Sequence, residues 1–341
     1  MTALQVTWFL LVGVLLTGYA ILDGFDLGVG IWFLKAKRDK ERTTLMRAIG
    51  PVWDGNEVWL LTGGGAIFAA FPPVYASVFS GFYLAMMLVV LVLMARAVSL
   101  EFRHLEANPL WRSTWDVVFS ISSVLAGLLF GVALGNILRG IPLDAKGNYT
   151  GTFLGLLNPY ALVIGILAVA MFAFHGANYI VLKTTGELEK KGRKWAFLSG
   201  IVYVILFVIG SVYTIFLNDH LLSNFNEVKV LWLIPLVALV SISASLFFGK
   251  REEAGKAFLF SSVSIGSLMG LVGAGLFPRL VPALGNPKLS LTVANSSSSE
   301  LTLKTMFIMA LIGVPVVLGY TIWIYRAFAG KVNPDETGGH Y

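Results

Sequence analysis

The stretch Gly18-Tyr-Ala-Ile-Leu-Asp-Gly-Phe-Asp-Leu-Gly-Val-Gly30 places two carboxylates inside the first long apolar run of the chain. An Asp at bilayer depth costs about 2.5–3.5 kcal/mol on insertion scales, so Asp23 and Asp26 need partners, water or a function. Their i,i+3 spacing puts both on one face of a helix. Gly24 and Gly28 allow a neighbouring helix to come close and shield these carboxylates from lipid. The stretch therefore predicts a buried polar site in a membrane helix, and a packed polar seam without chemistry is the alternative.

The composition places the chain in a membrane. Of its 341 residues, 57% are hydrophobic and only 13% are charged, and the mean hydropathy is +0.79; these values exclude an ordinary soluble domain. No Lys or Arg precedes Lys35, so the first apolar run lacks the basic region of a cleavable signal peptide and is expected to remain as a membrane span. The net charge of +6 is explained by cytoplasmic loops rather than by nucleic-acid binding. With no cysteines, the chain cannot form disulfides, iron–sulfur clusters or thiolate metal sites.

Apolar runs of about 20 residues are long enough to cross a bilayer. We predict nine such spans, at residues 6–34, 54–71, 77–99, 115–138, 159–182, 195–217, 229–248, 257–276 and 305–328. Lys and Arg gather in the connections after the first, third, fifth and seventh spans, whereas the connection 71–77 carries no charge. By the positive-inside rule the basic connections face the cytoplasm, which places the N-terminus outside and the C-terminus inside. The sequence thus predicts an all-α polytopic membrane protein.

The basic connection from Lys183 to Lys194 is the best place to divide the chain. Residues 1–182 then form an N-terminal transmembrane bundle that carries the acidic cluster, and residues 183–341 form a C-terminal transmembrane bundle. A long outer loop near 277–304 contains the polar run Asn295–Ser299, whose low complexity predicts mobility. Glycines spaced four residues apart in the fourth and eighth spans predict close helix crossings. These glycines are Gly127, Gly131, Gly135, Gly266 and Gly270.

The start of the second predicted span, Pro51-Val-Trp-Asp-Gly-Asn-Glu-Val-Trp-Leu60, adds polar residues at a depth similar to that of the first-span carboxylates. These are Asp54, Asn56 and Glu57. Asp54 and Glu57 are again i,i+3 on one helix face. Asp54 alone is also well placed to stabilise a helix start, where free amides and the positive end of the helix dipole favour an acid. Four carboxylates that converge on two consecutive helices are harder to explain as caps.

Other polar side chains are expected at a similar, cytoplasmic depth. Arg96 is placed to act as a counter-charge for the carboxylates, while Glu101 and Arg103 are expected to form a solvated ion pair of little energetic weight. His175 and Asn178 are i,i+3 in the fifth span. A lone intramembrane His is more often a hydrogen-bonded core residue than a ligand. Nevertheless, Asp, Glu, His and Asn at one depth are the groups that a proton relay needs.

Sequence motifs of soluble enzymes are missing: there is no Walker A sequence, no H-E-x-x-H and no G-x-S-x-G. Haem ligation by this chain alone is not expected. Of the four histidines, His104 lies at a span end, His220 in an outer loop and His340 in the tail. His175 is therefore the one candidate ligand at membrane depth, and Met is far more often core filler than an axial ligand.

Four motifs in the first part of the chain carry a family resemblance. They are Leu22-Asp-Gly-Phe-Asp-Leu-Gly28, Trp53-Asp-Gly-Asn-Glu-Val-Trp59, Glu101-Phe-Arg103, and His175-Gly-Ala-Asn178 followed by Lys183-Thr-Thr-Gly-Glu-Leu188. Together they resemble the smaller subunit, subunit II, of cytochrome bd-type quinol oxidases. The resemblance extends to about Arg193, and beyond that point only length, span number and orientation agree.

The resemblance implies a respiratory terminal oxidase in the cell membrane of a bacterium or archaeon. The complex would oxidise a membrane quinol and reduce oxygen to water, with haems b and d and the quinol site in a larger subunit I and no cofactor bound by this chain alone. It also implies nine helices, in two four-helix groups plus one peripheral helix, packed against a similarly built partner, and it leaves room for small accessory subunits. In the family the Asp of the second motif, here Asp54, is associated with a path that brings cytoplasmic protons to the oxygen-reducing haem.

We therefore expect a subunit II whose carboxylates support proton uptake from the cytoplasm. The proton path would use Asp54, Glu57, Asp23 and Asp26, with Asn56, Arg96, Glu101, His175 and Asn178 as supporting polar residues. A proton-coupled secondary transporter is the alternative from another class, but it predicts paired broken helices and a repeat between the halves, and we find neither in the sequence. A purely structural membrane partner is a third possibility, and it differs from the first in whether Asp54→Asn changes turnover.

Overall fold

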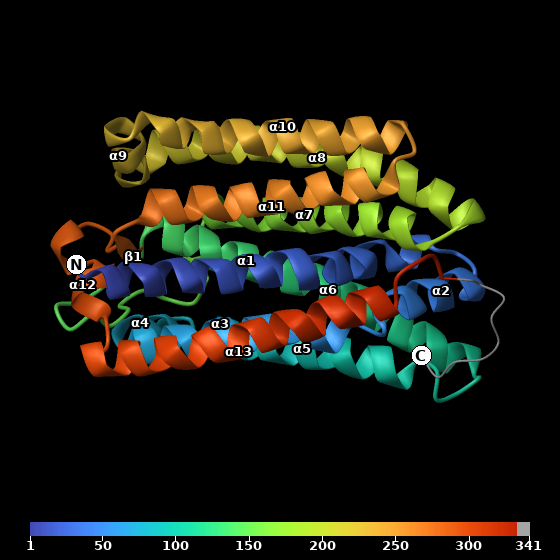
Figure 1. The fold of residues 1–341 in the computed structure, drawn as a ribbon, viewed down its shortest axis with the longest axis horizontal. Coiled ribbons are helices and arrows are strands. Elements are labelled where there is room, and N and C mark those ends of the chain that lie inside the picture. The colour runs from blue at the N-terminus through green and yellow to red at the C-terminus, as the bar shows by residue number, and fades with distance from the viewer. Residues whose placement is uncertain (333–341) are drawn as a thin grey trace.

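The computed structural model describes residues 1–332 and consists almost entirely of helices that run side by side (Figure 1). The long helices are α1 (Ala3–Trp32), α3 (Trp53–Ala70), α5 (Tyr83–Phe102), α6 (Pro109–Arg139), α7 (Pro159–Lys183), α8 (Gly186–Leu217), α10 (Leu233–Lys250), α11 (Ala254–Leu276) and α13 (Glu300–Ala327). The short helices are α2 (Asp39–Ile49), α4 (Pro72–Gly81), α9 (Asp219–Glu227) and α12 (Val293–Ser296), with 3-10 turns at Phe33–Lys35, Leu154–Leu157, Lys229–Trp232 and Pro287–Leu289. Two short strands, β1 (Arg279–Val281) and β2 (Leu291–Thr292), pair antiparallel.

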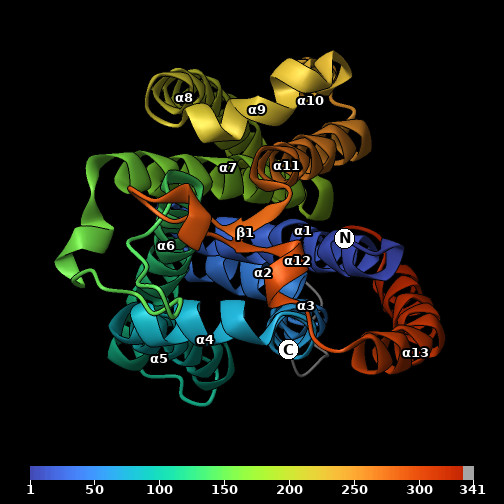
Figure 2. The same ribbon diagram turned by 90° about the vertical axis from the view of Figure 1, so that its left-hand side faces the viewer.

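The helices confirm the prediction of an all-α polytopic membrane protein. Within residues 1–332, eight helices are long and apolar enough to cross a membrane, and the number is nine if the bent pair α3–α4 is counted as one span. The placement differs at the connection 71–77, where α4 turns away from α3 by 119°. Pro72 and Pro73 lack the N–H groups that would continue α3, so α3 ends at Ala70. As a result α4 lies across the end of the bundle (Figure 2), and the next span begins at Tyr83 rather than at residue 77.

Seen along the helix axes, the long helices form two groups of four with α13 at the edge (Figure 2). The first group is α1, α3, α5 and α6, and the second is α7, α8, α10 and α11. Helix α7 joins the groups because it packs against α1 and α6 as well as against α8 and α11. Helix α13 packs against α1 and α3, although it is last in the sequence. A division of the chain at Lys183 stays a prediction.

Helix backbones approach closely where small residues face each other. A Cβ added to Gly28 of α1 would lie 2.6 Å from Cα of Gly176 in α7, and one added to Gly131 of α6 would lie 2.7 Å from Cα of Gly165 in α7. These contacts confirm the close crossings predicted at the glycines of α1 and α6, and the structure identifies α7 as the partner helix of both. The prediction is wrong for Gly266 of α11, where a Cβ would meet no atom within 4 Å. That residue instead lines an apolar groove between α10 and α11.

The two ends of the bundle differ in charge. The N-terminal end holds the start of the chain with α4, α9, α12 and β1, and the opposite end holds α2 and the last turn of α13 (Figure 1). We call the second the basic end, because it collects the Lys and Arg residues of the connections between α1 and α3, between α5 and α6, and between α7 and α8. The start of α1 and the end of α13 lie at opposite ends, as an odd number of spans requires. Which end faces the cytoplasm stays a prediction.

The polar segment after α11 is packed, and the expected mobility of residues 295–299 is wrong in this respect. Ser296 is fully buried. Ser298 donates its backbone N–H to the carbonyl of Ala70 at 2.9 Å and its Oγ–H to the carbonyl of Ala69 at 2.6 Å. These carbonyls are left without helical partners where α3 ends at the bend, so Ser298 caps both of them.

Candidate intramembrane polar site

Asp23 of α1 and Arg96 of α5 form a buried ion pair. Both side chains are fully buried, and the guanidinium donates to both carboxylate oxygens, with Nη1 at 2.7 Å from Oδ2 and Nη2 bound to Oδ1. Such bidentate pairs are among the strongest hydrogen bonds in proteins. Arg96 thus supplies the counter-charge that the sequence suggested, and the pair joins α1 to α5.

Asp26, one turn further along α1, takes part in a second set of hydrogen bonds. Asn56 of α3 donates Nδ2–H to Asp26 Oδ2 at 2.8 Å and to the carbonyl of Leu22 at 3.2 Å. The Oδ1 atom of Asn56 accepts from the hydroxyl of Tyr325 in α13 at 2.8 Å. The other oxygen of Asp26, Oδ1, is buried and has no hydrogen-bond partner among residues 1–332. Asp26 therefore has one carboxylate oxygen that can still accept a hydrogen bond, whereas both oxygens of Asp23 already accept from Arg96.

Helix α3 contributes the other two carboxylates, on either side of Asn56. Glu57 is half-buried and interacts electrostatically with Arg96, Asp23 and Asp54. Asp54 is exposed in the first turn of α3. The structure therefore brings three of the four predicted carboxylates together around the guanidinium and leaves Asp54 at the outer edge of the site. Its place in the first turn also suits the helix dipole, as the capping alternative requires.

Asp54 begins an exposed stripe along α3. Val58, Leu61 and Phe68 follow it at helical spacing, and Leu61 is 73% exposed while Phe68 is 58% exposed. A carboxylate on so apolar a face is costly against lipid, so this part of the surface needs a protein or aqueous neighbour.

His175 and Asn178 lie in α7, within the core. The ring of His175 has Nδ1 at 2.7 Å from Ser261 Oγ and Nε2 at 3.0 Å from the carbonyl of Ile21. Asn178 donates to the carbonyl of Phe174, one turn earlier in its own helix. Within residues 1–332, neither side chain hydrogen-bonds to any of the carboxylates. Both are fully or almost fully buried and act here as hydrogen-bonded core residues.

The three histidines within residues 1–332 do not fit a haem site. Both ring nitrogens of His175 are engaged, and Nε2 of His220 donates to the carbonyl of Leu138 at 3.0 Å. His104 is exposed in the connection after α5, and His340 lies outside the described residues. No cluster of three or more His, Asp or Glu side chains suited to a metal ion occurs within residues 1–332. We therefore assign no chemical step to a haem held by this chain.

A separate ionic network lies at the basic end, and it corrects the expected Glu101–Arg103 pair. Arg103 is buried, with Nε at 2.5 Å from Asp116 Oδ1 and Nη2 at 2.6 Å from Asp39 Oδ1. Arg42 also binds Asp116, at 2.7 Å. Asp116 is 1% exposed and needs a counter-charge, whereas Glu101 is exposed and can be solvated by water. The network ties α2 to α5 and α6.

Three residues of these networks were not expected from the sequence. Asp116 lies at the start of a predicted span, and an acid just inside a span is a signal that it is paired. Tyr19 precedes Asp23 by one helical turn, and its buried hydroxyl interacts with the carboxylate of Asp23. Tyr325 is distant in sequence from Asn56 and carries no local signal of their contact.

The intramembrane site carries more acidic groups than basic ones. One guanidinium, that of Arg96, faces three carboxyl groups, so the set holds more acid than it neutralises. The fold and the site thus define a polytopic helical membrane protein with a carboxylate cluster at bilayer depth.

The family model for cytochrome bd terminal oxidase subunit II matches residues 4–328. The chain belongs to this family, which confirms the resemblance carried by the four motifs, and it is a subunit of a terminal oxidase.

Named relatives match nearly the whole chain. It is 38% identical over 362 residues to the "probable cytochrome oxidase subunit 2" of Haemophilus influenzae, covering 97% of this chain and 96% of the relative. It is 37% identical to the "cytochrome bd-I ubiquinol oxidase subunit 2" of Escherichia coli K12, covering 98% and 96%, and 36% identical to the "cytochrome bd ubiquinol oxidase subunit 2" of Bacillus subtilis, covering 98% and 99%. A chain in the solved structure of the bd oxidase from Geobacillus thermodenitrificans shares the fold, with a TM-score of 0.77, 16% identity and coverage of 96% of this chain and 99% of that one.

Proposed function

We propose that this chain is the haem-free subunit of a quinol-oxidising bd-type oxidase. In this role it scaffolds a larger subunit I and supports proton uptake from the cytoplasm. The names of the relatives from Escherichia coli and Bacillus subtilis support ubiquinol or a related quinol as the electron donor. Because the three histidines within residues 1–332 do not fit haem ligation, we assign haems b and d and the quinol site to the partner. The observation that carries the proton role is an exposed carboxylate, Asp54, beside a buried carboxylate cluster at membrane depth.

The exposed stripe of α3 supports the place of subunit I. Asp54 stands on this face, and α5 of the same helix group exposes apolar side chains such as Met87 (54% exposed) and Leu91 (64% exposed). Helix α8 exposes a similar apolar face over Val202–Phe216, but no acidic residue lies on it. An acid at membrane depth needs a protein or aqueous neighbour. We therefore infer that α3 and α5 face the partner, with Asp54 at the edge of this interface in contact with water, while α8 faces lipid.

Each of the four carboxylates has a different role in the proposed proton path. Asp54 is accessible and exchanges protons with water at the edge of the complex. Glu57, one turn further along α3, is half-buried and receives them. Asp26 has an unoccupied acceptor oxygen in the interior, while Asp23 holds the guanidinium of Arg96 in place and is the least suited of the four to move a proton.

The direction of uptake rests on charge asymmetry. Lys and Arg collect at the basic end, and Asp54 lies in the first turn of α3, which starts from that end (Figure 1). The positive-inside rule then places the basic end in the cytoplasm. Reduction of oxygen to water consumes protons, so uptake from that side adds to the membrane potential without pumping.

A proton-coupled transporter is less favoured. That class places paired broken helices near the bilayer midplane. Within residues 1–332 the one bent pair is α3–α4, and its bend at Phe71 lies at the N-terminal end of the bundle rather than at its middle. The stronger alternative is a purely structural role, in which the acidic residues only hold the helices together.

Replacement of Asp54 by Asn tests the proposal in the assembled complex. Asn caps and fits a helix start about as well as Asp, so assembly and the haem spectrum should be unchanged. We expect quinol-driven oxygen consumption to fall several-fold, because the side chain can no longer titrate. Asp219→Asn, at an exposed carboxylate of α9 at the other end, is the matched control and should keep full turnover. Full activity of the Asp54→Asn complex over the working pH range would rule out the proton role and leave the structural one.

A further inference from the structure

Tyr325 points inward from a helix that otherwise faces outward. It lies in the last turn of α13, at the basic end of the bundle (Figure 1). Tyr320 and Trp323 on the same helix are 59% and 61% exposed, and within α13 only Leu303 is buried. The ring of Tyr325 instead meets that of the fully buried Phe25 edge-on, with 6.4 Å between the centroids. One polar aromatic side chain of a peripheral helix is thus turned toward the carboxylate cluster.

The hydroxyl of Tyr325 begins a short chain of hydrogen bonds that ends at Asp26. It donates to Oδ1 of Asn56 at 2.8 Å. The amide nitrogen of Asn56 donates to Oδ2 of Asp26 at 2.8 Å and to the carbonyl of Leu22 at 3.2 Å. Both of these partners are acceptors, so the amide nitrogen must face them and the amide oxygen must face the tyrosine. Every donor in the chain therefore points toward the carboxylate, an arrangement in which successive hydrogen bonds strengthen one another.

The orientation of Asn56 depends on this hydroxyl. The side chain of Asn56 is 2% exposed, so its oxygen cannot turn to bulk water. Without the hydroxyl of Tyr325 this oxygen would be an unpaired buried acceptor, which is costly. The amide would then gain by rotating, and a rotated amide no longer directs its N–H group at Asp26.

The end of α13 is held in place by the second helix group. Lys183, at the end of α7, donates from Nζ to the carbonyls of Phe328 and Gly330, at 2.6 and 3.0 Å. The carbonyl of Lys183 in turn accepts from the backbone N–H of Val332 at 2.7 Å. These contacts fix the residues that follow Tyr325, so its hydroxyl is presented to the cluster at a defined place.

We propose that Tyr325 is a positioning residue for proton uptake by this subunit. Its hydroxyl fixes the amide of Asn56, and this amide holds Asp26 with the second carboxylate oxygen still able to accept a hydrogen bond. The inference rests on the proposed proton role of the carboxylates. It adds to that role a residue of α13, the last helix in the sequence.

Removal of the hydroxyl in the assembled oxidase tests this proposal. Tyr325→Phe keeps the ring that meets Phe25, so assembly and the haem spectrum should be unchanged. We expect kcat for quinol-driven oxygen consumption to fall about two- to tenfold, the effect of losing one neutral hydrogen bond. The KM for quinol should stay the same, because we assign the quinol site to the partner.

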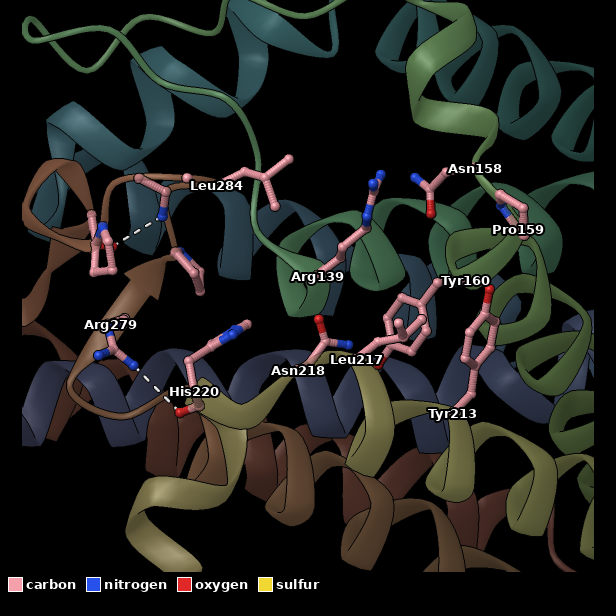
Figure 3. Close-up of a pocket in the computed structure, with 15 residues that line it drawn as sticks. Arg139, Asn158, Pro159, Tyr160, Tyr213, Leu217, Asn218, His220, Arg279 and Leu284 are labelled. Atoms are coloured by element: carbon pink, nitrogen blue, oxygen red, sulfur yellow. Dashed lines mark hydrogen bonds between the residues drawn. The ribbon is translucent and has the colours of Figure 1, made fainter.

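Tyr160→Phe is the matched control. Tyr160 lies at the other end of the bundle, where it lines a cavity of about 450 Å³ (Figure 3). Its side chain is also buried, and its hydroxyl joins α7 to α8 through Thr214 at 2.8 Å. The control removes an interhelical hydrogen bond of a similar kind but leaves the carboxylate cluster untouched, so it should keep full turnover.

A kinetic double-mutant cycle with Asn56→Leu separates positioning from packing. If Tyr325 acts through Asn56, adding Tyr325→Phe to the Asn56→Leu complex should cause no further fall in kcat. An equal fall in both backgrounds would show that the tyrosine acts independently of the amide, and would overturn the proposal. Wild-type turnover of Tyr325→Phe beside an impaired Asp54→Asn complex would also overturn it, while leaving proton uptake by the subunit intact. Full turnover of Asp54→Asn would overturn the proton role itself, and the proposal with it.

Discussion

We predict that replacing Asp23, the acidic partner of the buried ion pair with Arg96, lowers the free energy of unfolding strongly, and that a second substitution at Arg96 restores it. Asp23→Leu has a similar volume but removes both acceptors of a guanidinium that is fully buried. Removal of one partner of a buried pair costs about 3–5 kcal/mol. Glu57 also interacts with Arg96 and compensates in part, so we expect the lower end, about 3 kcal/mol. Adding Arg96→Met removes the orphaned charge and should bring stability back to within about 1 kcal/mol of wild type.

The free energy of unfolding is measured by titrating the purified complex with SDS in mixed micelles and following tryptophan fluorescence. Glu187→Gln is the control, because Glu187 and Lys190 form an ion pair whose side chains are 66% and 72% exposed. Such exposed pairs contribute little, and we expect no measurable change. A loss below about 1 kcal/mol for Asp23→Leu, or a double variant as unstable as the single one, would refute the assignment of a desolvated charge pair.

Three other predictions concern the basic end, the helix crossing and the topology. Burial by itself raises the pKa of Glu41, but hydrogen bonds from Lys191 and from the backbone at Arg38 outweigh it and hold the pKa below its ordinary value. A carboxyl group whose pKa is lowered in the folded state stabilises the fold above its ordinary pKa of about 4.3, and this stabilisation is lost as the pH falls through the folded-state pKa. The difference in melting temperature between wild type and Glu41→Gln should therefore narrow from about pH 7 to about pH 4. A difference that stays constant over this range would contradict the prediction. Gly28→Val should block assembly, because its Cβ would lie 2.0 Å from the carbonyl oxygen of Phe172, while Gly13→Val, in open space on the same helix, should assemble normally by size-exclusion chromatography. Single cysteines at the exposed positions Lys146 and Lys190 should react with impermeant thiol reagents from opposite sides, Lys190 from the cytoplasm; labelling of both from one side would exclude the proposed orientation.

Local patterns were sufficient for much of the fold. The length of each apolar run predicts a membrane helix because every backbone group at that depth must be hydrogen-bonded within its own segment. The glycine spacing around Gly28 and Gly131 correctly predicted close crossings. The same spacing failed at Gly266, since a small residue permits close approach without requiring it. The bend at Phe71 was not predicted, because the two prolines that follow it fit both a loop and a helix start.

The sequence by itself determined that Asp23 and Asp26 lie at membrane depth and need partners, because the cost of an unpaired carboxylate there holds for any fold. The sequence also predicted Arg96 as their counter-charge, but only the tertiary structure decided which carboxylate it binds. Arg96 pairs with Asp23, 73 residues away, whereas Asn56 reaches Asp26 from the next long helix. The rotation of each helix, set by packing across the bundle, also left Asp54 exposed while its neighbour Asn56 is buried. The contact between Tyr325 and Asn56 had no sequence signal, since the two residues are 269 positions apart and meet only when α13 packs against α3.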